Sequence, residues 1–168
     1  MSNRVVGSSG NLVIAAIGLG SNLGDRAAHL EYAIARLRNL LGNLRVSHFL
    51  ETIPVGAPGP QPLFLNAAAV GQAAMPARDV LDTLLAIEKE RGRERAYPNA
   101  PRSLDLDLLL FGDATIDEPG LIVPHPRFRE RRFVLEPLAE IAPDMTDPVT
   151  GQTVSELLRT LGFHDAEP

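Results

Sequence analysis

The stretch 101–112 reads PRSLDLDLLLFG and carries two aspartates, Asp105 and Asp107, inside a run of leucines. Successive side chains of a β-strand point to opposite faces, so these two carboxylates share one face, with Cα atoms about 6.5–7 Å apart. The leucines fill the other face and are expected to pack on helices. Two like charges on an apolar strand require compensation. The sequence therefore predicts a strand over 103–111 that carries a functional site.

Apolar patterning around this strand predicts the rest of the fold. The expected strands are 11–18, 45–53, 62–70 and 103–111, and the expected helices are 25–41 and 75–91. The order β-α-β-β-α-β predicts an α+β fold, the ferredoxin-like sandwich. The remaining chain adds a short strand near 114–116 and helices near 131–141 and 154–161. We expect a flexible N-terminal tail over residues 1–10 and a single domain over 11–168.

Composition narrows the class of protein. The chain has 168 residues, 45% of them hydrophobic, which is typical of a globular domain. No apolar run approaches the ~20 residues of a membrane helix, and the N-terminus lacks the apolar core of a signal peptide. Cysteine is absent, which excludes disulfides and thiolate zinc sites. A net charge of −5 argues against nucleic-acid binding. We expect a cytoplasmic protein.

Arginines gather near the aspartates. The chain has one lysine and fifteen arginines, and eight of the arginines fall between Arg91 and Arg132. The planar guanidinium suits bidentate contacts to phosphate. A carboxylate pair can hold one or two magnesium ions and leave coordination sites for substrate phosphates. The alternative is a solvated pair of aspartates, but the neighbouring arginines favour a metal–polyphosphate site.

Further polar residues stand out along the chain. Asn66 lies in an apolar strand two residues after Phe64, an arrangement that suits stacking and reading of a flat heterocycle. A core phenylalanine beside an edge-strand asparagine explains these two residues equally well. His125 lies in VPHPRFRERRF, where it either contacts phosphate or occupies a surface turn. GLGSNLG (18–24) misses the dinucleotide fingerprint by one residue and predicts a tight strand-to-helix turn beside a pocket. Two loops, 54–62 and 92–101, have the composition and length of lids.

Four motifs together resemble one family. IGLGSNLGD, FLNAA, RSLDLDLLLFG and VPHPRFRERRFVLEPL are similar, in order and spacing, to the 6-hydroxymethyl-7,8-dihydropterin pyrophosphokinases of folate biosynthesis. The resemblance extends from about residue 13 to 160. It implies a ferredoxin-like fold and transfer of pyrophosphate from ATP to the pterin hydroxymethyl group, with release of AMP.

The resemblance also implies roles for individual residues. Asp105 and Asp107 would be the ligands of two magnesium ions. Arg93 and Arg102 would be the catalytic loop arginines that act on the polyphosphate. His125 and Arg131 would be further ATP contacts.

On the pterin side, the resemblance implies that Asn66 reads the heterocycle, helped by Thr52 and by the backbone near Val55. Phe64 and Phe133 would be the two rings that sandwich the pterin. Glu88 stands where the family often has an acid of unclear role, so we expect at most a supporting function for it.

A non-catalytic ferredoxin-like module that binds a pterin or nucleotide is the alternative. The two aspartates together with Arg93 and Arg102 favour an enzyme. We expect a monomer that binds ATP and hydroxymethyldihydropterin, and neither nucleic acid nor membrane. Phosphoryl-type transfer depends mainly on positioning and charge stabilisation, so no strong general base is required near Asn66.

Overall fold

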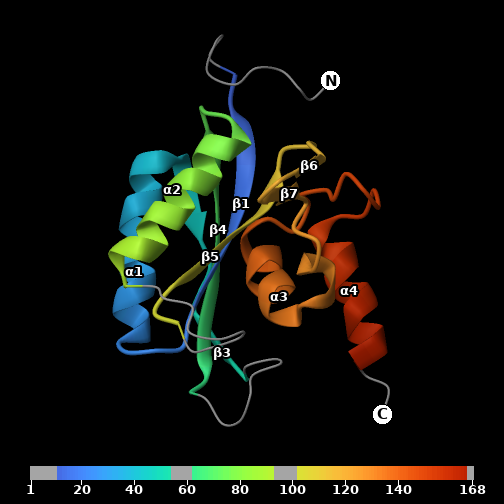
Figure 1. Cartoon of the computed structure of the whole chain (residues 1–168). Helices are drawn as coiled ribbons and strands as arrows, with labels where there is room; N and C mark the ends of the chain where they lie inside the picture. The colour runs from blue at the N-terminus through green and yellow to red at the C-terminus, as the bar shows by residue number, and fades with distance from the viewer. Residues whose placement is uncertain (1–10, 54–61, 93–101, 166–168) are drawn as a thin grey trace.

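One antiparallel sheet lies between two layers of helices (Figure 1). The computed structural model describes residues 11–53, 62–92 and 102–165, with side chains up to residue 162. The strands of the sheet are β1 (Val13–Ser21), β2 (Gly42–Val46), β3 (Leu50–Thr52), β4 (Phe64–Ala73) and β5 (Asp105–Phe111). Their order is β2-β4-β1-β5, and β3 also pairs with β4. This order, with every pairing antiparallel, confirms the predicted ferredoxin-like topology.

Two helices cover one face of the sheet. They are α1 (Arg26–Leu40) and α2 (Ala77–Glu90), the pair on the left in Figure 1. α1 begins at Arg26 because the Asp25 carboxylate accepts the Ala28 N–H at 3.1 Å and so caps a free backbone donor. The buried core between the helices and the sheet includes Ile17, Leu30, Leu37, Leu84 and Ile87.

The other face is only partly covered by helices. α3 (Arg132–Ile141), α4 (Val154–Asp165) and the short 3₁₀ helix η1 (Phe128–Glu130) pack there, on the right in Figure 1. Their core is centred on Phe128, Leu135, Leu138, Leu110 and Val70. Small residues on β1 and β4, such as Ala16 and Ala68, let this layer approach the strands closely.

Two elements differ from the sequence-based prediction. The expected single strand 45–53 is divided into β2 and β3, because the Ser47 hydroxyl accepts the Ala68 N–H at 2.9 Å and replaces a ladder bond at the break. The expected short strand near 114–116 is the hairpin of β6 (Ile116–Glu118) and β7 (Leu121–Val123). Three-residue strands are too short to show a period. Gly42, which directly follows the expected helix 25–41, is the first residue of β2, and Leu41 caps α1.

The predicted tail (1–10) and most of the two predicted lid loops lie outside the described residues, so these remain predictions. Among the helices within 11–53, 62–92 and 102–165, none is both long and apolar enough to cross a membrane.

Candidate active site

Three strands bring the predicted site residues together at the end of β1. Gly20 is paired with Asn66 on β4 and with Asp105 on β5. One row across the sheet therefore reads Asp105, Gly20, Asn66. Neighbouring strands lie about 4.8 Å apart, so the Cα atoms of Asp105 and Asn66 are separated by roughly 10 Å. Asp105, predicted to bind metal, and Asn66, predicted to bind the pterin, thus lie on either side of Gly20.

Gly20 creates the space at the centre of this row. A Cβ at this position would lie 3.1 Å from Asn66 Oδ1 and 3.5 Å from the Phe64 ring. A side chain would therefore crowd the Asn66 amide and come into ordinary contact with the Phe64 ring, two residues predicted to bind the pterin. The glycine belongs to GLGSNLG, but its neighbours on β4 could not be read from that motif.

Asp105 and Asp107 occupy the β5 side of the site. Their side chains are 28% and 34% exposed, while Leu106 between them is buried against the helices. Arg102 Nη1 lies 3.9 Å from Asp105 Oδ2, and His125 Nε2 lies 3.9 Å from Asp107 Oδ1. The predicted sharing of one strand face is confirmed by this alternation of burial.

The donor set on β5 fits magnesium. Within the described residues, no group of three or more acidic, histidine or cysteine side chains is placed to hold an ion by protein ligands alone. Two hard carboxylates leave most of a coordination sphere to water and substrate oxygens, which is how Mg²⁺ is usually bound beside a polyphosphate.

His125 faces the aspartates as a neutral ring. The backbone N–H of His125 donates to the Leu109 carbonyl at 2.9 Å, which fixes the chain around His125 against β5. Its Nδ1 accepts the Arg127 N–H at 3.1 Å, so the ring proton resides on Nε2, the atom nearest Asp107. Burial, and then the positive charge of Arg131, lower the pKa of His125. The contact with Asp107 is therefore not an ion pair at neutral pH, and Nε2–H is available as a hydrogen-bond donor.

The predicted arginine cluster separates into two kinds. The Arg131 guanidinium lies 5.7 Å from the centre of the Phe133 ring, so these two predicted site residues are neighbours. Three others contact acids: Arg127 lies 3.8 Å from Glu130, Arg129 lies 2.5 Å from Asp147, and Arg132 lies 3.8 Å from Glu136. Arg93 lies outside the described residues.

The β4 side of the site holds the predicted pterin residues. Asn66 is 5% exposed, and its Nδ2 donates to Thr52 Oγ1 at 2.5 Å, so the hydroxyl fixes the orientation of the amide. The Arg102 guanidinium lies 5.6 Å from the centre of the Phe64 ring. Arg102 therefore stands between the two sides of the site. Val55 lies outside the described residues.

Glu88 supports β5 from the other side of the sheet. It belongs to α2, is 6% exposed, and accepts the Leu106 N–H at 2.7 Å. That N–H lies between the two aspartates on the edge strand of the sheet. Glu88 thus anchors the backbone that carries Asp105 and Asp107.

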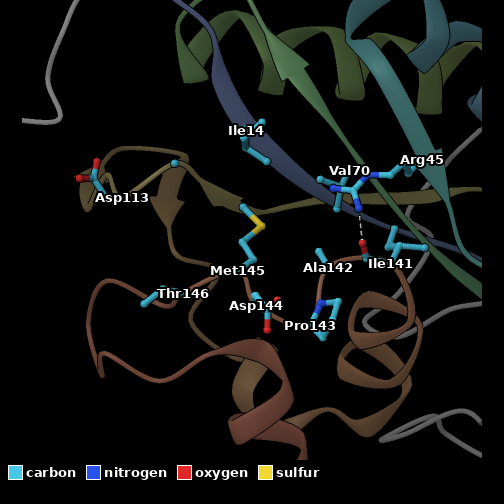
Figure 2. A pocket seen from close by; sticks show the side chains of 11 residues that line it. Ile14, Arg45, Val70, Asp113, Ile141, Ala142, Pro143, Asp144, Met145 and Thr146 are labelled. Carbon is cyan, nitrogen blue, oxygen red and sulfur yellow. Dashed lines mark hydrogen bonds between the residues drawn. The ribbon is translucent and has the colours of Figure 1, made fainter.

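A cavity of about 460 Å³ lies at the opposite end of β1 (Figure 2). Ile14, Gly112 and Met145 are among its lining residues, and Arg45 reaches across to donate to the Ile141 carbonyl. Ile14 and Gly20 are six residues apart on one strand, or about 20 Å. None of the predicted site residues that the structure describes lines this cavity, so it is separate from the site at the end of β1.

Comparison with known proteins identifies the family. The model of the 7,8-dihydro-6-hydroxymethylpterin-pyrophosphokinase (HPPK) family matches residues 16–143. The chain belongs to this family. The Synechocystis 2-amino-4-hydroxy-6-hydroxymethyldihydropteridine pyrophosphokinase is 41% identical over 146 residues, which cover 86% of this chain and 74% of the relative. The Bacillus subtilis protein of the same name is 43% identical and covers 82% of this chain and 83% of the relative.

Longer HPPK relatives also match. The folic acid synthesis protein fol1 of Pneumocystis carinii is 37% identical over 90% of this chain, which spans only 20% of that protein. The solved HPPK-DHPS structure of Plasmodium falciparum has a TM-score of 0.70 and 16% identity, covering 89% of this chain and 45% of that one. At that identity the likeness concerns the fold alone, and it confirms the predicted α+β architecture.

Proposed function

We propose that this chain transfers pyrophosphate from ATP to the hydroxymethyl group of 6-hydroxymethyl-7,8-dihydropterin and releases AMP. The observation that carries the proposal is the row Asp105, Gly20, Asn66, which sets a carboxylate for metal and phosphate beside an amide that can read a heterocycle. Membership of the HPPK family confirms the predicted class of enzyme, an ATP-dependent diphosphokinase. It also disfavours a non-catalytic binding module.

Asp105 and Asp107 would hold magnesium, which neutralises phosphate charge and orients the phosphate oxygens when bound. Charge balance supports two ions. ATP brings about four negative charges, and the aspartates add two. Arg93, Arg102 and Arg131 would offset three of these six. One divalent ion would then leave a negative charge uncompensated in a half-buried site, and a second ion offsets it.

The phosphates of ATP would be contacted by the segment 125–131 and by the arginines before β5. His125 would donate from Nε2, and Arg131 would contribute positive charge from the start of α3. Arg102 would act on the polyphosphate as charge redistributes, because its guanidinium stands between Asp105 and Phe64. Arg93 would share this catalytic role.

The pterin would lie on the β4 side. Phe64 and Phe133 would contact its two faces, and Asn66 would read its edge while Thr52 holds the amide in place. The backbone near Val55 would contribute further contacts. Gly20 leaves the space that brings the pterin hydroxymethyl group toward the phosphates.

In the reaction, a bond forms between the pterin hydroxymethyl oxygen and the β-phosphorus of ATP, and the bond from that phosphorus to the α,β-bridging oxygen breaks. The hydroxyl proton is released, and AMP departs with the bridging oxygen. The chain's contribution is to align the two substrates and to place positive charge where charge accumulates. We also propose that the enzyme is a cytoplasmic monomer and binds no nucleic acid.

Formation of AMP from ATP, with and without the pterin, tests this function. We expect AMP to accumulate only when both substrates and magnesium are present. Asp107→Asn should abolish it, whereas Asp113→Asn, a matched change beyond the far end of β5, should leave it unchanged. Equal AMP formation by wild type and Asp107→Asn would contradict the assignment, and absence of AMP from all samples would contradict the function.

A further inference from the structure

Asn22 follows β1 directly and is fully buried. β1 is antiparallel to both β4 and β5, so its last residues lie beside the residues that precede those two strands. Asn22 therefore stands where the chain enters the strand of Phe64 and Asn66 and also the strand of Asp105 and Asp107. The motif GLGSNLG places an asparagine at this junction.

The Asn22 amide contacts both entering segments. Its Oδ1 accepts the Arg102 N–H at 2.9 Å, and its Nδ2 donates to the Pro62 carbonyl at 3.4 Å. The Asn22 backbone N–H donates to the Arg102 carbonyl at 3.1 Å. One residue thus holds both polar groups of the Arg102 backbone. Asparagine suits this place because a single amide supplies an acceptor and a donor, whereas aspartate would present an acceptor to each neighbour.

We propose that Asn22 is a positioning residue that fixes the backbone of Arg102 and so holds its guanidinium between Asp105 and Phe64. The proposal rests on the proposed role of Arg102 in pyrophosphoryl transfer. The guanidinium stands 3.9 Å from Asp105 and 5.6 Å from the Phe64 ring, so a shift of its backbone changes both relations. A misplacement of about 1 Å at a reacting centre can reduce a rate about 100-fold.

Asn22→Ala tests the proposal with two readouts. Hydrogen exchange should show the Arg102 amide exchanging at least about tenfold faster, since its acceptor is gone. The single-turnover rate at saturating substrates should fall about 10- to 100-fold. ATP affinity should change less than about threefold, because the phosphate contacts at His125 and Arg131 are untouched.

The change should also be made in an Arg102→Ala background. If Asn22 acts through Arg102, Asn22→Ala should cost little further rate there, because contacts that act as a unit are not additive. An equal rate loss in both backgrounds would overturn the proposal, as would unchanged exchange of the Arg102 amide. If Arg102→Ala itself leaves the rate unchanged, the proposed catalytic role fails, while the exchange measurement still decides whether Asn22 holds that backbone.

Asn22→Asp covers the case in which the alanine variant does not fold. It keeps the Oδ1 acceptor, so the Arg102 amide should stay protected and the rate should stay within about threefold of wild type. It places a carboxylate oxygen next to the Pro62 carbonyl, and the two oxygens repel. Because Pro62 leads into the strand of Phe64 and Asn66, pterin affinity should fall. Loss of Arg102 protection with pterin affinity unchanged would overturn the proposal. Asn43→Gly, at an exposed position of positive φ on β2, is the control and should match wild type in both assays.

Discussion

Removing the Asp147 carboxylate should destabilise the fold strongly. Its side chain is 0% exposed and accepts Arg129 Nε at 2.5 Å and Arg129 Nη2 at 3.0 Å. It also accepts the Val149 N–H at 3.0 Å and the Thr150 hydroxyl at 2.8 Å. Arg129 belongs to η1, the turn between His125 and Arg131. This carboxylate therefore joins the loop after α3 to the segment proposed to grip the phosphates.

The contacts of the Asp147 carboxylate determine how much stability its removal should cost. Breaking a buried ion pair from one side costs about 3–5 kcal/mol, and the 25% exposure of Arg129 places this case near the lower end. Counting the lost hydrogen bonds, at about 1 kcal/mol for each neutral donor and more for the guanidinium, gives a similar figure. We therefore expect Asp147→Ala to lower the free energy of unfolding by about 3 kcal/mol, which corresponds to a fall of roughly 6–12 °C in Tm for a chain of this length.

Urea denaturation at pH 7 measures this loss, with Glu136→Ala as the control. Glu136 lies 3.8 Å from Arg132 in an exposed pair, so its removal should cost less than about 0.5 kcal/mol. Burial would raise the pKa of Asp147, but the hydrogen bonds from Arg129, Thr150 and Val149 outweigh it and lower that pKa. The stabilisation is therefore complete above about pH 4 and is lost as pH falls through the lowered pKa. A loss below about 1 kcal/mol at pH 7, or one equal to the control, would refute this reasoning.

Three further outcomes follow from the site and its supports. Asp105→Ala should abolish turnover without lowering the free energy of unfolding of the metal-free protein, because it relieves repulsion with Asp107; marked destabilisation in urea would contradict this. Gly20→Ala should weaken pterin binding at least about tenfold and leave ATP affinity within about threefold, as measured by calorimetry, because its Cβ would crowd the Asn66 amide. Burial and the charge of Arg91, whose Nε donates to His29 Nδ1 at 3.0 Å, lower the pKa of His29, so stability should fall as pH drops below about 6.5. His29→Gln should reduce that dependence in urea titrations at pH 5–8, and the remainder should come from His125, whose pKa is also lowered. A slope equal to that of wild type would contradict the role of His29.

Local patterns predicted the main helices and strands, because apolar periodicity is a local property, and the shared face of Asp105 and Asp107, because side chains alternate along a strand. They missed the break between β2 and β3 and the β6–β7 hairpin. They could not predict partners that depend on strand register. Gly20 pairs with Asn66, 46 positions later in the chain, and with Asp105, 85 positions later. The sequence around Gly20 does not indicate either partner. The Arg129–Asp147 pair was missed for a related reason: an aspartate in a loop shows no period, and its partner Arg129 lies 18 positions earlier, in η1.

In the proposed site, the arrangement of the strands separates the residues for substrate recognition from those for phosphate chemistry. Among the described residues, those proposed for the pterin lie on β3, β4 and α3. Those proposed for metal and phosphate lie on β5, at Arg102 three residues before its start, and in the segment 125–131. β1 lies between them and contributes no side chain at the point of contact, because Gly20 stands there. If the two substrates bind on these two sides, their alignment depends on the backbone at the end of β1. We therefore expect the turn after this strand, with Asn22 at its start, to control how the substrates are aligned.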